Sequence, residues 1–259
     1  MGTTKAVEVL WQGVTEGRFD PGELGEDLSV DDGERLQLAL LDRWCDEGEA
    51  LGGWKVGLTS GRSRDAFGVG IRPFGFVLAG RIMTSGASVE AERIHRCGIE
   101  TELSFRIGRE LSGSHVTAAD ARGVVDAVAP AFEINERRID ADASPGARVA
   151  DDLAQWGIVV GDDVSPVPAD FDFEGLLVEM RFDGELVDSV AARGHIDDHF
   201  VSIARLAQEL AKFDLGLEPG QRIITGAFTR HQVQGSGEWE GRFGSLGGVA
   251  GPGPCTCVC

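Results

Sequence analysis

Apolar residues recur at two spacings along the chain, and these spacings predict helices in some segments and strands in others. Residues 1–50 follow a helical spacing, and "DDHFVSIARLAQELAKF" (197–213) repeats it on an amphipathic face. Strict alternation over 99–107 predicts a strand with one apolar face and one polar face. "VTAADARGVVDAVA" (116–129) predicts a helix that begins at the capping-box pair Thr117 and Asp120 and ends at Pro130.

The remaining apolar runs are short, and most are bounded by glycine. They predict strands, and "GLLVEMRFDGELVDSV" predicts a hairpin that turns at Asp183-Gly184. The other expected strands are 52–60, 74–83, 131–134, 155–161, 221–228 and 238–243. Because strands outnumber helices and rarely alternate with them, the fold class is α+β, mixed and mostly β, with N-terminal helices. We expect a helical segment over 1–52, a catalytic domain over 53–250 and a flexible tail over 251–259.

Charge and composition exclude several classes of protein. The net charge of −19 opposes binding to nucleic acids and to anionic membranes. No long apolar run and no signal peptide is evident, so we expect a cytoplasmic protein. The five cysteines suggest no disulfide framework. Cys255, Cys257 and Cys259 are expected to be free thiols on a disordered tail, with a soft-metal site as the alternative.

Three glutamates are the main candidates for chemistry. Glu100 and Glu102 share the polar face of the alternating strand, which indicates either a solvated face or two carboxylates that share a cation. Glu133 interrupts the apolar run "AVAPAFEI", where an unpaired carboxylate would be costly to bury unless the strand lies at an edge. Three hard oxygen ligands together would suit Mg²⁺ or Mn²⁺.

Lys55 and His195 are weaker candidates. Lys55 lies between glycines in the strand segment "GGWKVGL" and is one of only three lysines, so it is either an acid/base or carboxylate anchor, or a surface residue. His195 lies just before a predicted helix, where a capping or packing role is as consistent as a functional one.

Several segments follow one another in a specific order and spacing: "GGWKVGLTS", "IETELSFRIG", "APAFEINERRID", "RGHI", "LEPGQRIITGAF" and "GRFGSLGGV". Together they resemble the fumarylacetoacetate hydrolase superfamily, in particular its 2-keto-4-pentenoate hydratase and 4-oxalocrotonate decarboxylase branch. The resemblance covers about residues 35–250.

The resemblance implies a homo-oligomeric, metal-dependent enzyme that acts on a small-molecule 2-oxo acid. By position, it places Mg²⁺ (or Mn²⁺) on Glu100, Glu102 and Glu133, and a catalytic or substrate-anchoring role on Lys55. We expect further substrate contacts in or beside the matching segments, from Gly57, Leu58, Thr59, Phe74, Arg138, Asp152, His195 and Thr225.

The chain also departs from the pattern of that branch. Pro73 stands where hydratases usually have an aspartate, and "FGFVL" is closer to the decarboxylases. The usual Ala-Asp-Asn appears as Ala150-Asp151-Asp152, which is expected to add negative charge near the site. Hydration of a 2-hydroxy-2,4-dienoate or 2-oxo-enoate is the predicted reaction. The alternatives are decarboxylation of a 2-oxo-enedioate, C–C hydrolysis of an acylpyruvate, and a biosynthetic tailoring or non-catalytic role.

Overall fold

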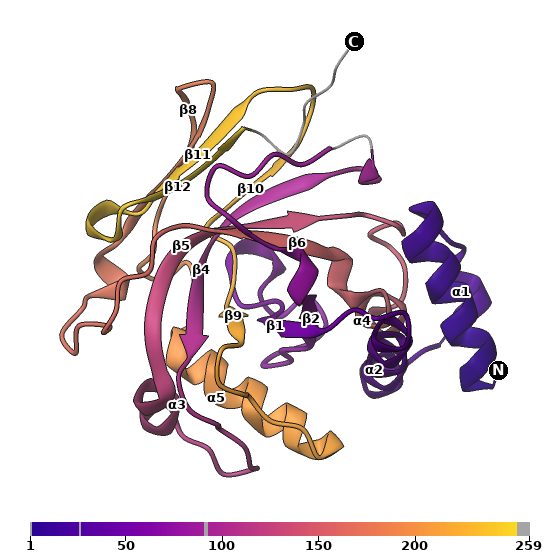
Figure 1. The fold of residues 1–259 in the computed structure, drawn as a ribbon. Helices are drawn as coiled ribbons and strands as arrows, with labels where there is room; N and C mark the ends of the chain where they lie inside the picture. The colour runs from indigo at the N-terminus through magenta and orange to yellow at the C-terminus, as the bar shows by residue number, and fades with distance from the viewer. Residues whose placement is uncertain (1, 26, 91–92, 253–259) are drawn as a thin grey trace.

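The computed structural model describes residues 2–25, 27–90 and 93–252 (Figure 1). The helices in these ranges are α1 (Thr3–Glu16), α2 (Val30–Asp46), α3 (Ala118–Val124), α4 (Pro145–Ala150) and α5 (His199–Leu210). The strands are β1 (Leu51–Val56), β2 (Phe74–Leu78), β3 (Ile82–Thr84), β4 (Gly98–Ile107), β5 (Val125–Asn135), β6 (Gln155–Val160), β7 (Leu177–Phe182), β8 (Glu185–Ala191), β9 (Arg222–Ile224), β10 (Thr229–Gln232), β11 (Glu238–Arg242) and β12 (Gly248–Pro252).

A mixed eight-stranded sheet forms the centre of the structure. Its strands run in the order β2-β1-β9-β4-β5-β6-β3, and β10 also pairs with β4. One small aliphatic cluster joins distant parts of this order, because Val77 of β2 and Ile224 of β9 pack with Ala129 of β5 and with Ile158 and Val160 of β6. The sheet therefore curls, and one of its faces becomes an enclosed interior.

Helices cover the other face of this sheet with the larger hydrophobic core. Leu10 of α1, Leu40 of α2 and Ile203 of α5 belong to the same buried cluster as Trp54 of β1 and Phe105 of β4. In Figure 1, α1 and α2 lie to one side of the sheet, and α3 and α5 lie below it. This division of helices from strands confirms the α+β class that was predicted.

The second sheet has four strands in the order β12-β11-β7-β8 and lies at the top of Figure 1. The predicted hairpin is confirmed: β7 and β8 pair in antiparallel register around Asp183 and Gly184. Both turn residues have positive φ angles, of 49° and 82°, which is the conformation that an Asp-Gly hairpin turn requires.

The helix predicted over 116–129 was too long. Its start is confirmed, since Thr117 and Asp120 form both hydrogen bonds of a capping box. However, α3 ends at Val124, and β5 then continues through Pro130. The proline is tolerated because it lies beyond the last pair of β5 with β6, where its carbonyl accepts a 2.8 Å hydrogen bond from the amide of Gly161.

Two other expectations need correction or stay open. The strand expected over 74–83 is interrupted by a 3-10 turn at Ala79–Arg81, which separates β2 from β3. The domain boundaries remain predictions, although α1 and α2 share their core with the strands. Cys255, Cys257 and Cys259 lie outside the described residues.

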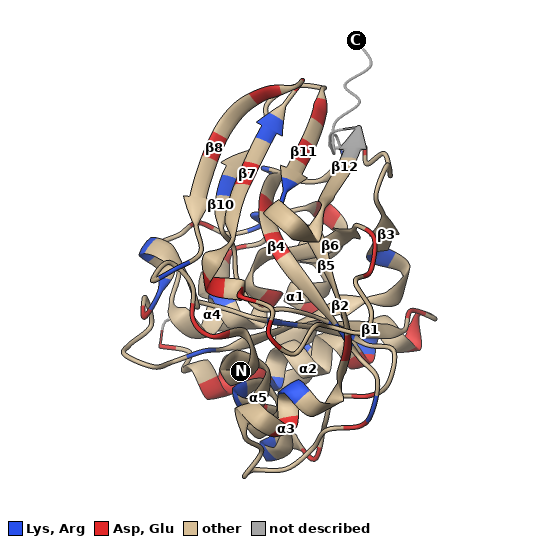
Figure 2. Cartoon of the chain, turned by 90° about the vertical axis from the view of Figure 1, so that its left-hand side faces the viewer, with Lys and Arg blue, Asp and Glu red and all other residues tan. Residues whose placement is uncertain are grey.

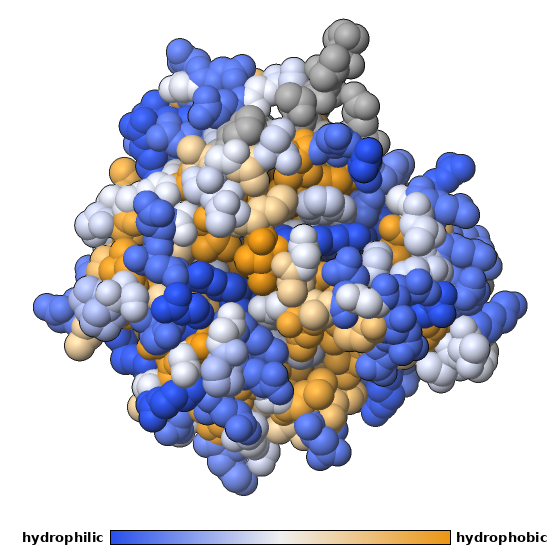
Figure 3. All heavy atoms as spheres, in the orientation of Figure 1, coloured by the Kyte–Doolittle hydropathy of each residue, from blue (hydrophilic) through white to orange (hydrophobic). Residues whose placement is uncertain are grey.

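Charged and hydrophobic groups are both spread over the surface. Figure 2 shows acidic segments on helices, strands and loops, with basic segments among them. In the face shown in Figure 3, hydrophobic atoms reach the surface between hydrophilic patches. Among the described residues, no helix combines the length and the apolar character needed to span a bilayer.

The contact between α2 and α4 leaves no room for a side chain at Gly33. A Cβ atom there would lie 2.3 Å from the carbonyl oxygen of Gly146 in α4. We therefore expect Gly33→Ala to lower the free energy of unfolding by about 1–3 kcal/mol, as overpacking does in general. Gly123→Ala in α3 is the matched control: its Cβ would meet no atom closer than 3.9 Å, so stability should stay equal or rise. Equal urea midpoints for wild type and Gly33→Ala would contradict the prediction.

Candidate active site

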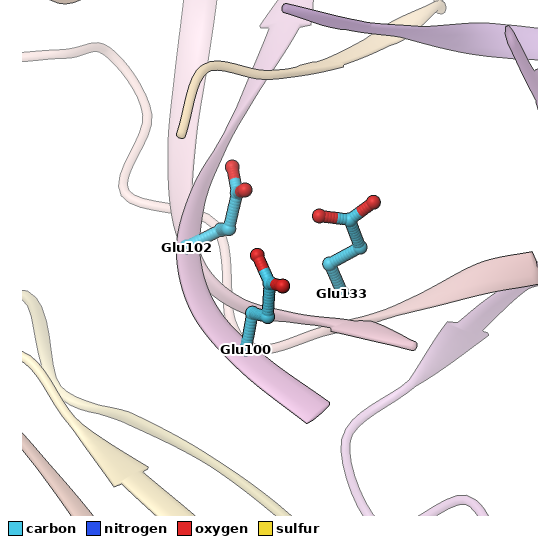
Figure 4. A group of neighbouring side chains, drawn as sticks. All are labelled: Glu100, Glu102 and Glu133. Atoms are coloured by element: carbon cyan, nitrogen blue, oxygen red, sulfur yellow. The ribbon is translucent and has the colours of Figure 1, made fainter. Parts of the chain in front are cut away.

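Three glutamates converge on the enclosed face of the large sheet (Figure 4). Glu100 and Glu102 share one face of β4, and Glu133 lies directly opposite Glu100 on β5. Carboxylate oxygens from all three lie within 4.8 Å of one another. The residues are only 6%, 3% and 2% exposed, so the face is buried and the solvated-face alternative is wrong.

Two basic side chains neutralise part of this buried charge. Lys55 forms an ion pair with Glu133 through its Nζ atom. Arg230 lies opposite Glu100 on β10 and binds both of its carboxylate oxygens, with a distance of 3.1 Å from Nη2 to Oε2. Glu102 accepts a 2.7 Å hydrogen bond from the backbone amide of Gly226, and no described basic side chain pairs with it.

The pKa values follow from this unequal neutralisation. Burial, and then the charges of Glu133 and Glu100, raise the pKa of Glu102 well above its ordinary value. Burial also raises the pKa of Glu133, although Lys55 opposes that change. Burial would lower the pKa of Lys55, but the adjacent Glu133 and Glu100 outweigh it and raise that pKa, so the ammonium form is favoured.

The position of Lys55 depends on two unusual backbone features. Gly75 faces it across β1 and β2, and a Cβ atom at that position would lie 2.7 Å from Lys55 Cγ. On the other side, the Leu153 carbonyl accepts a 3.2 Å hydrogen bond from Lys55 Nζ. Residues 152–154 all have positive φ angles, of 54°, 50° and 64°, a strained arrangement for residues other than glycine. Such strain is typical of functional sites.

Burial opposes the negative charge that the sequence suggested for Asp152. Its Oδ1 atom accepts hydrogen bonds from the Phe76 amide at 2.8 Å and from Gln37 Nε2 at 3.1 Å. Burial raises the pKa of Asp152 well above its ordinary value, although Lys55 opposes the shift. A protonated carboxyl is neutral and offers an acceptor and a donor, as an amide does. In that form Asp152 would offer the hydrogen bonding of the asparagine that the family resemblance leads us to expect at this position.

A buried ion network supports the adjacent segment. Arg138 donates to Asp151 Oδ1 at 2.6 Å and to Glu136 Oε2 at 2.9 Å, and all three side chains are almost completely buried. Burial raises the pKa of Asp151 to about 6, despite the opposing charge of Arg138. The network fixes the chain on both sides of α4, just before the strained turn.

The glutamates form part of a cavity of about 330 Å³. Its lining also includes four residues that were predicted to act on or contact the substrate: Lys55, Gly57, Leu58 and Thr59. Leu58 has a positive φ angle of 60°, a second strained position in the wall. These seven predicted site residues are thus brought together by the fold, although their roles remain predictions.

Five other predicted contacts lie away from the described cavity lining. Phe74 packs edge-on against Trp54 in the core, and Arg138 and Asp152 are held in the networks above. Thr225 bonds His199 through its hydroxyl, at 2.8 Å from Nδ1. The His195 carbonyl accepts a 3.0 Å hydrogen bond from the amide of Gly61, which ties down the adjacent loop.

The sequence interpretation missed several residues of the cavity wall. Arg230, Arg148 and the Leu153 carbonyl were not predicted, because nothing in a single sequence places them beside the glutamates. His199 was also missed, but it is almost completely buried and burial lowers its pKa to about 4. It is therefore a neutral packing residue that holds Thr225, and it does not line the cavity.

The matching family model is the fumarylacetoacetate (FAA) hydrolase C-terminal family, over residues 55–244. The chain belongs to the fumarylacetoacetate hydrolase family. This confirms the resemblance seen in the sequence. The match begins at Lys55 and spans all three glutamates, so the cavity described above lies within the family region.

Characterised members of the fumarylacetoacetate hydrolase family resemble this chain over most of its length. A 2-hydroxypent-2,4-dienoate hydratase of Pseudomonas putida is 31% identical, over 74% of this chain and 86% of the relative. A 4-oxalocrotonate decarboxylase of a Pseudomonas species is 29% identical, over 88% and 89%. The solved 4-oxalocrotonate decarboxylase of Pseudomonas putida G7, complexed with magnesium and adipate, superimposes with a TM-score of 0.88 at 22% identity, over 96% of each chain.

Arg230 should compete with any cation held by the glutamates. Even at a dielectric near that of water, which gives a lower bound for a buried site, removing a unit charge from a neighbouring side chain changes the interaction with a divalent ion by about 1–2 kcal/mol. We therefore expect Arg230→Met to tighten Mg²⁺ binding roughly tenfold, as measured by calorimetry. Arg242→Met, which removes the surface pair with Glu240, is the control and should leave the affinity unchanged. Weaker Mg²⁺ binding in Arg230→Met would show instead that Arg230 positions Glu100.

Proposed function

We propose that this protein is a divalent-metal-dependent lyase that hydrates a 2-hydroxy-2,4-dienoate or a 2-oxo-enoate. The observation that carries the proposal is the convergence of three buried carboxylates and a buried lysine in one cavity. The hydratase relative at 31% identity supports the choice of reaction.

The donor set fits a hard divalent cation. Glu100, Glu102 and Glu133 supply oxygen ligands within one small space, and the buried Glu102 carboxylate has no described cationic partner. Such a carboxylate is costly to bury in its charged form unless a cation joins it. Mg²⁺, or Mn²⁺, bound there would act as a Lewis acid toward the carboxylate and the neighbouring oxygen of a 2-oxo acid.

Lys55 is the proton-transfer group in this proposal. Its ammonium donates to Glu133 and to the Leu153 carbonyl, which leaves one N–H for a substrate in the cavity. Lys55 donates a proton to the terminal carbon of the dienol and regains one from its enol hydroxyl, which gives the conjugated 2-oxo-enoate. Addition of water then places hydroxide on C4 and a proton on C3, so one molecule of water is consumed and Lys55 ends in its starting form.

Decarboxylation of a 2-oxo-enedioate is the second candidate, and the decarboxylase relative favours it. Loss of CO₂ leaves the same type of dienolate, so the same proton donor could serve. Acylpyruvate hydrolysis is less well supported, because it usually requires a histidine–acid pair. No histidine is found among the described residues that line the cavity.

The product mass distinguishes these reactions. The protein would be incubated with Mg²⁺ and either 2-hydroxypenta-2,4-dienoate or 2-oxohex-3-enedioate, followed by mass spectrometry. Gain of water supports the proposal, loss of CO₂ supports the second candidate, and an unchanged mass with both compounds contradicts both.

Metal binding should depend on Glu133. We expect Glu133→Gln to abolish Mg²⁺ binding in calorimetry while the thermal unfolding transition is kept, because one of three carboxylate ligands is lost without a change in shape. Glu209→Gln, which alters a surface ion pair with Lys212, should bind as the wild type does. An unchanged affinity in Glu133→Gln would remove the metal site from the proposal.

Turnover should depend on Lys55. We expect Lys55→Met to keep its affinity for Mg²⁺ but to lower kcat by at least about 10²-fold, the range for a positioned proton donor. Lys212→Met, at an exposed lysine, is the matched control. Near-normal kcat in Lys55→Met would make Lys55 a structural residue.

We also propose that the protein is a cytoplasmic homo-oligomer. The family resemblance supports assembly, and the net charge of −19 is consistent with that location. Within the chain, Trp11 and Trp44 already pack edge-on with ring centroids 4.7 Å apart, so they partly cover each other.

A further inference from the structure

Arg148 contributes a guanidinium to the wall of the cavity that contains the glutamates. It projects from α4, whose Ala147, Val149 and Ala150 are buried. Arg148 itself is half-buried, whereas the glutamates are at most 6% exposed. It therefore lies nearer the mouth, together with the exposed lining residues Arg137 and Asp140.

The positive charge of Arg148 is not neutralised by the protein. No described acidic side chain forms an ion pair with it, and the acids near it in the wall are already engaged. Asp140 binds Arg96 at 2.7 Å, and Asp151 binds Arg138. Arg230, the other basic residue of the inner wall besides Lys55, is occupied by Glu100.

The guanidinium is nevertheless held in place. It lies over the ring of Phe67, 4.9 Å from the centroid, in the loop that follows β1. That loop is fastened by Arg72, which binds Asp65 and Asp197 at 2.7 Å each. Burial and the charge of Arg230 lower the pKa of Arg148, a sign that its surroundings oppose a cation. An anion beside Arg148 would counteract this effect and stabilise its charged form.

We infer that Arg148 binds a second carboxylate of the substrate, at the end remote from the glutamates, so that the substrate is a 2-oxo dioate. The inference rests on the proposed function, which places the 2-oxo acid end at Glu100, Glu102 and Glu133. A planar guanidinium matches a carboxylate with two parallel hydrogen bonds. The lining also contains apolar residues suited to a short hydrocarbon chain, among them Leu58, Leu153, Ala154 and Ala227.

Two saturated analogues test this assignment without turnover. Binding of 2-oxoadipate and of 2-oxohexanoate, which differ only in the remote carboxylate, would be measured by calorimetry in the presence of Mg²⁺. We expect the wild type to prefer the dioate roughly 10- to 100-fold, the usual contribution of a charge-assisted hydrogen-bonded pair. Arg148→Met should lose that preference while its affinity for 2-oxohexanoate stays unchanged, which also shows that the variant is folded.

The controls separate this inference from the proposed function. Arg122→Met removes a comparable arginine, stacked 4.1 Å from the Phe200 ring outside the cavity, and should keep the preference. Equal affinity of the wild type for both analogues, or loss of the preference only in Arg137→Met, would overturn the role of Arg148 and leave the proposed function intact. If neither analogue binds in a Mg²⁺-dependent manner, both the role of Arg148 and the proposed function are overturned.

Discussion

The burial of three carboxylates on one face of a sheet is the constraint on which the rest of the structure depends. Like charges within 4.8 Å in an apolar interior repel strongly, and each also loses its hydration. Two cations, Lys55 and Arg230, and one backbone amide, that of Gly226, offset this cost. These groups come from β1, β10 and the segment between β9 and β10, so the curled topology is what brings them to the glutamates.

The residues that surround Lys55 hold its side chain in one place. Gly75 removes the side chain that would displace it, and the left-handed turn at 152–154 points a carbonyl at its Nζ atom. Gln37 links this turn to the helices, since its Nε2 atom donates to Asp152 and to the carbonyls of Phe74 and Val149. The close approach of α2 and α4 therefore affects the active site, because it determines where Gln37 of α2 bonds to the turn at 152–154.

Local patterns in the sequence predicted much of the fold but only part of the site. The strand at 99–107, the hairpin at Asp183-Gly184 and the capping box at Thr117 follow from near neighbours, and all three are confirmed. The end of α3 and the passage of β5 through Pro130 depend on pairing with β4, which continues from Val125 past Pro130 and which no local pattern contains. The convergence of the glutamates with Lys55 was expected mainly from the family resemblance. Arg148 and Arg230 come close only through the tertiary fold.

The charge distribution along the cavity gives the site a direction. At the glutamates, the two cations Lys55 and Arg230 face three carboxylates. One negative charge is therefore left, and it must be balanced by a proton or by a bound cation. The raised pKa of Glu102 reflects this imbalance. Toward the mouth, Arg148 has the opposite requirement, because no described acid pairs with it. A ligand that is anionic at both ends, with a metal ion beneath one of them, satisfies both requirements at once. A neutral or monoanionic ligand would leave the charge at one end of the cavity without an opposite charge. This electrostatic difference is a physical basis for substrate choice, and it does not depend on the shape of the cavity.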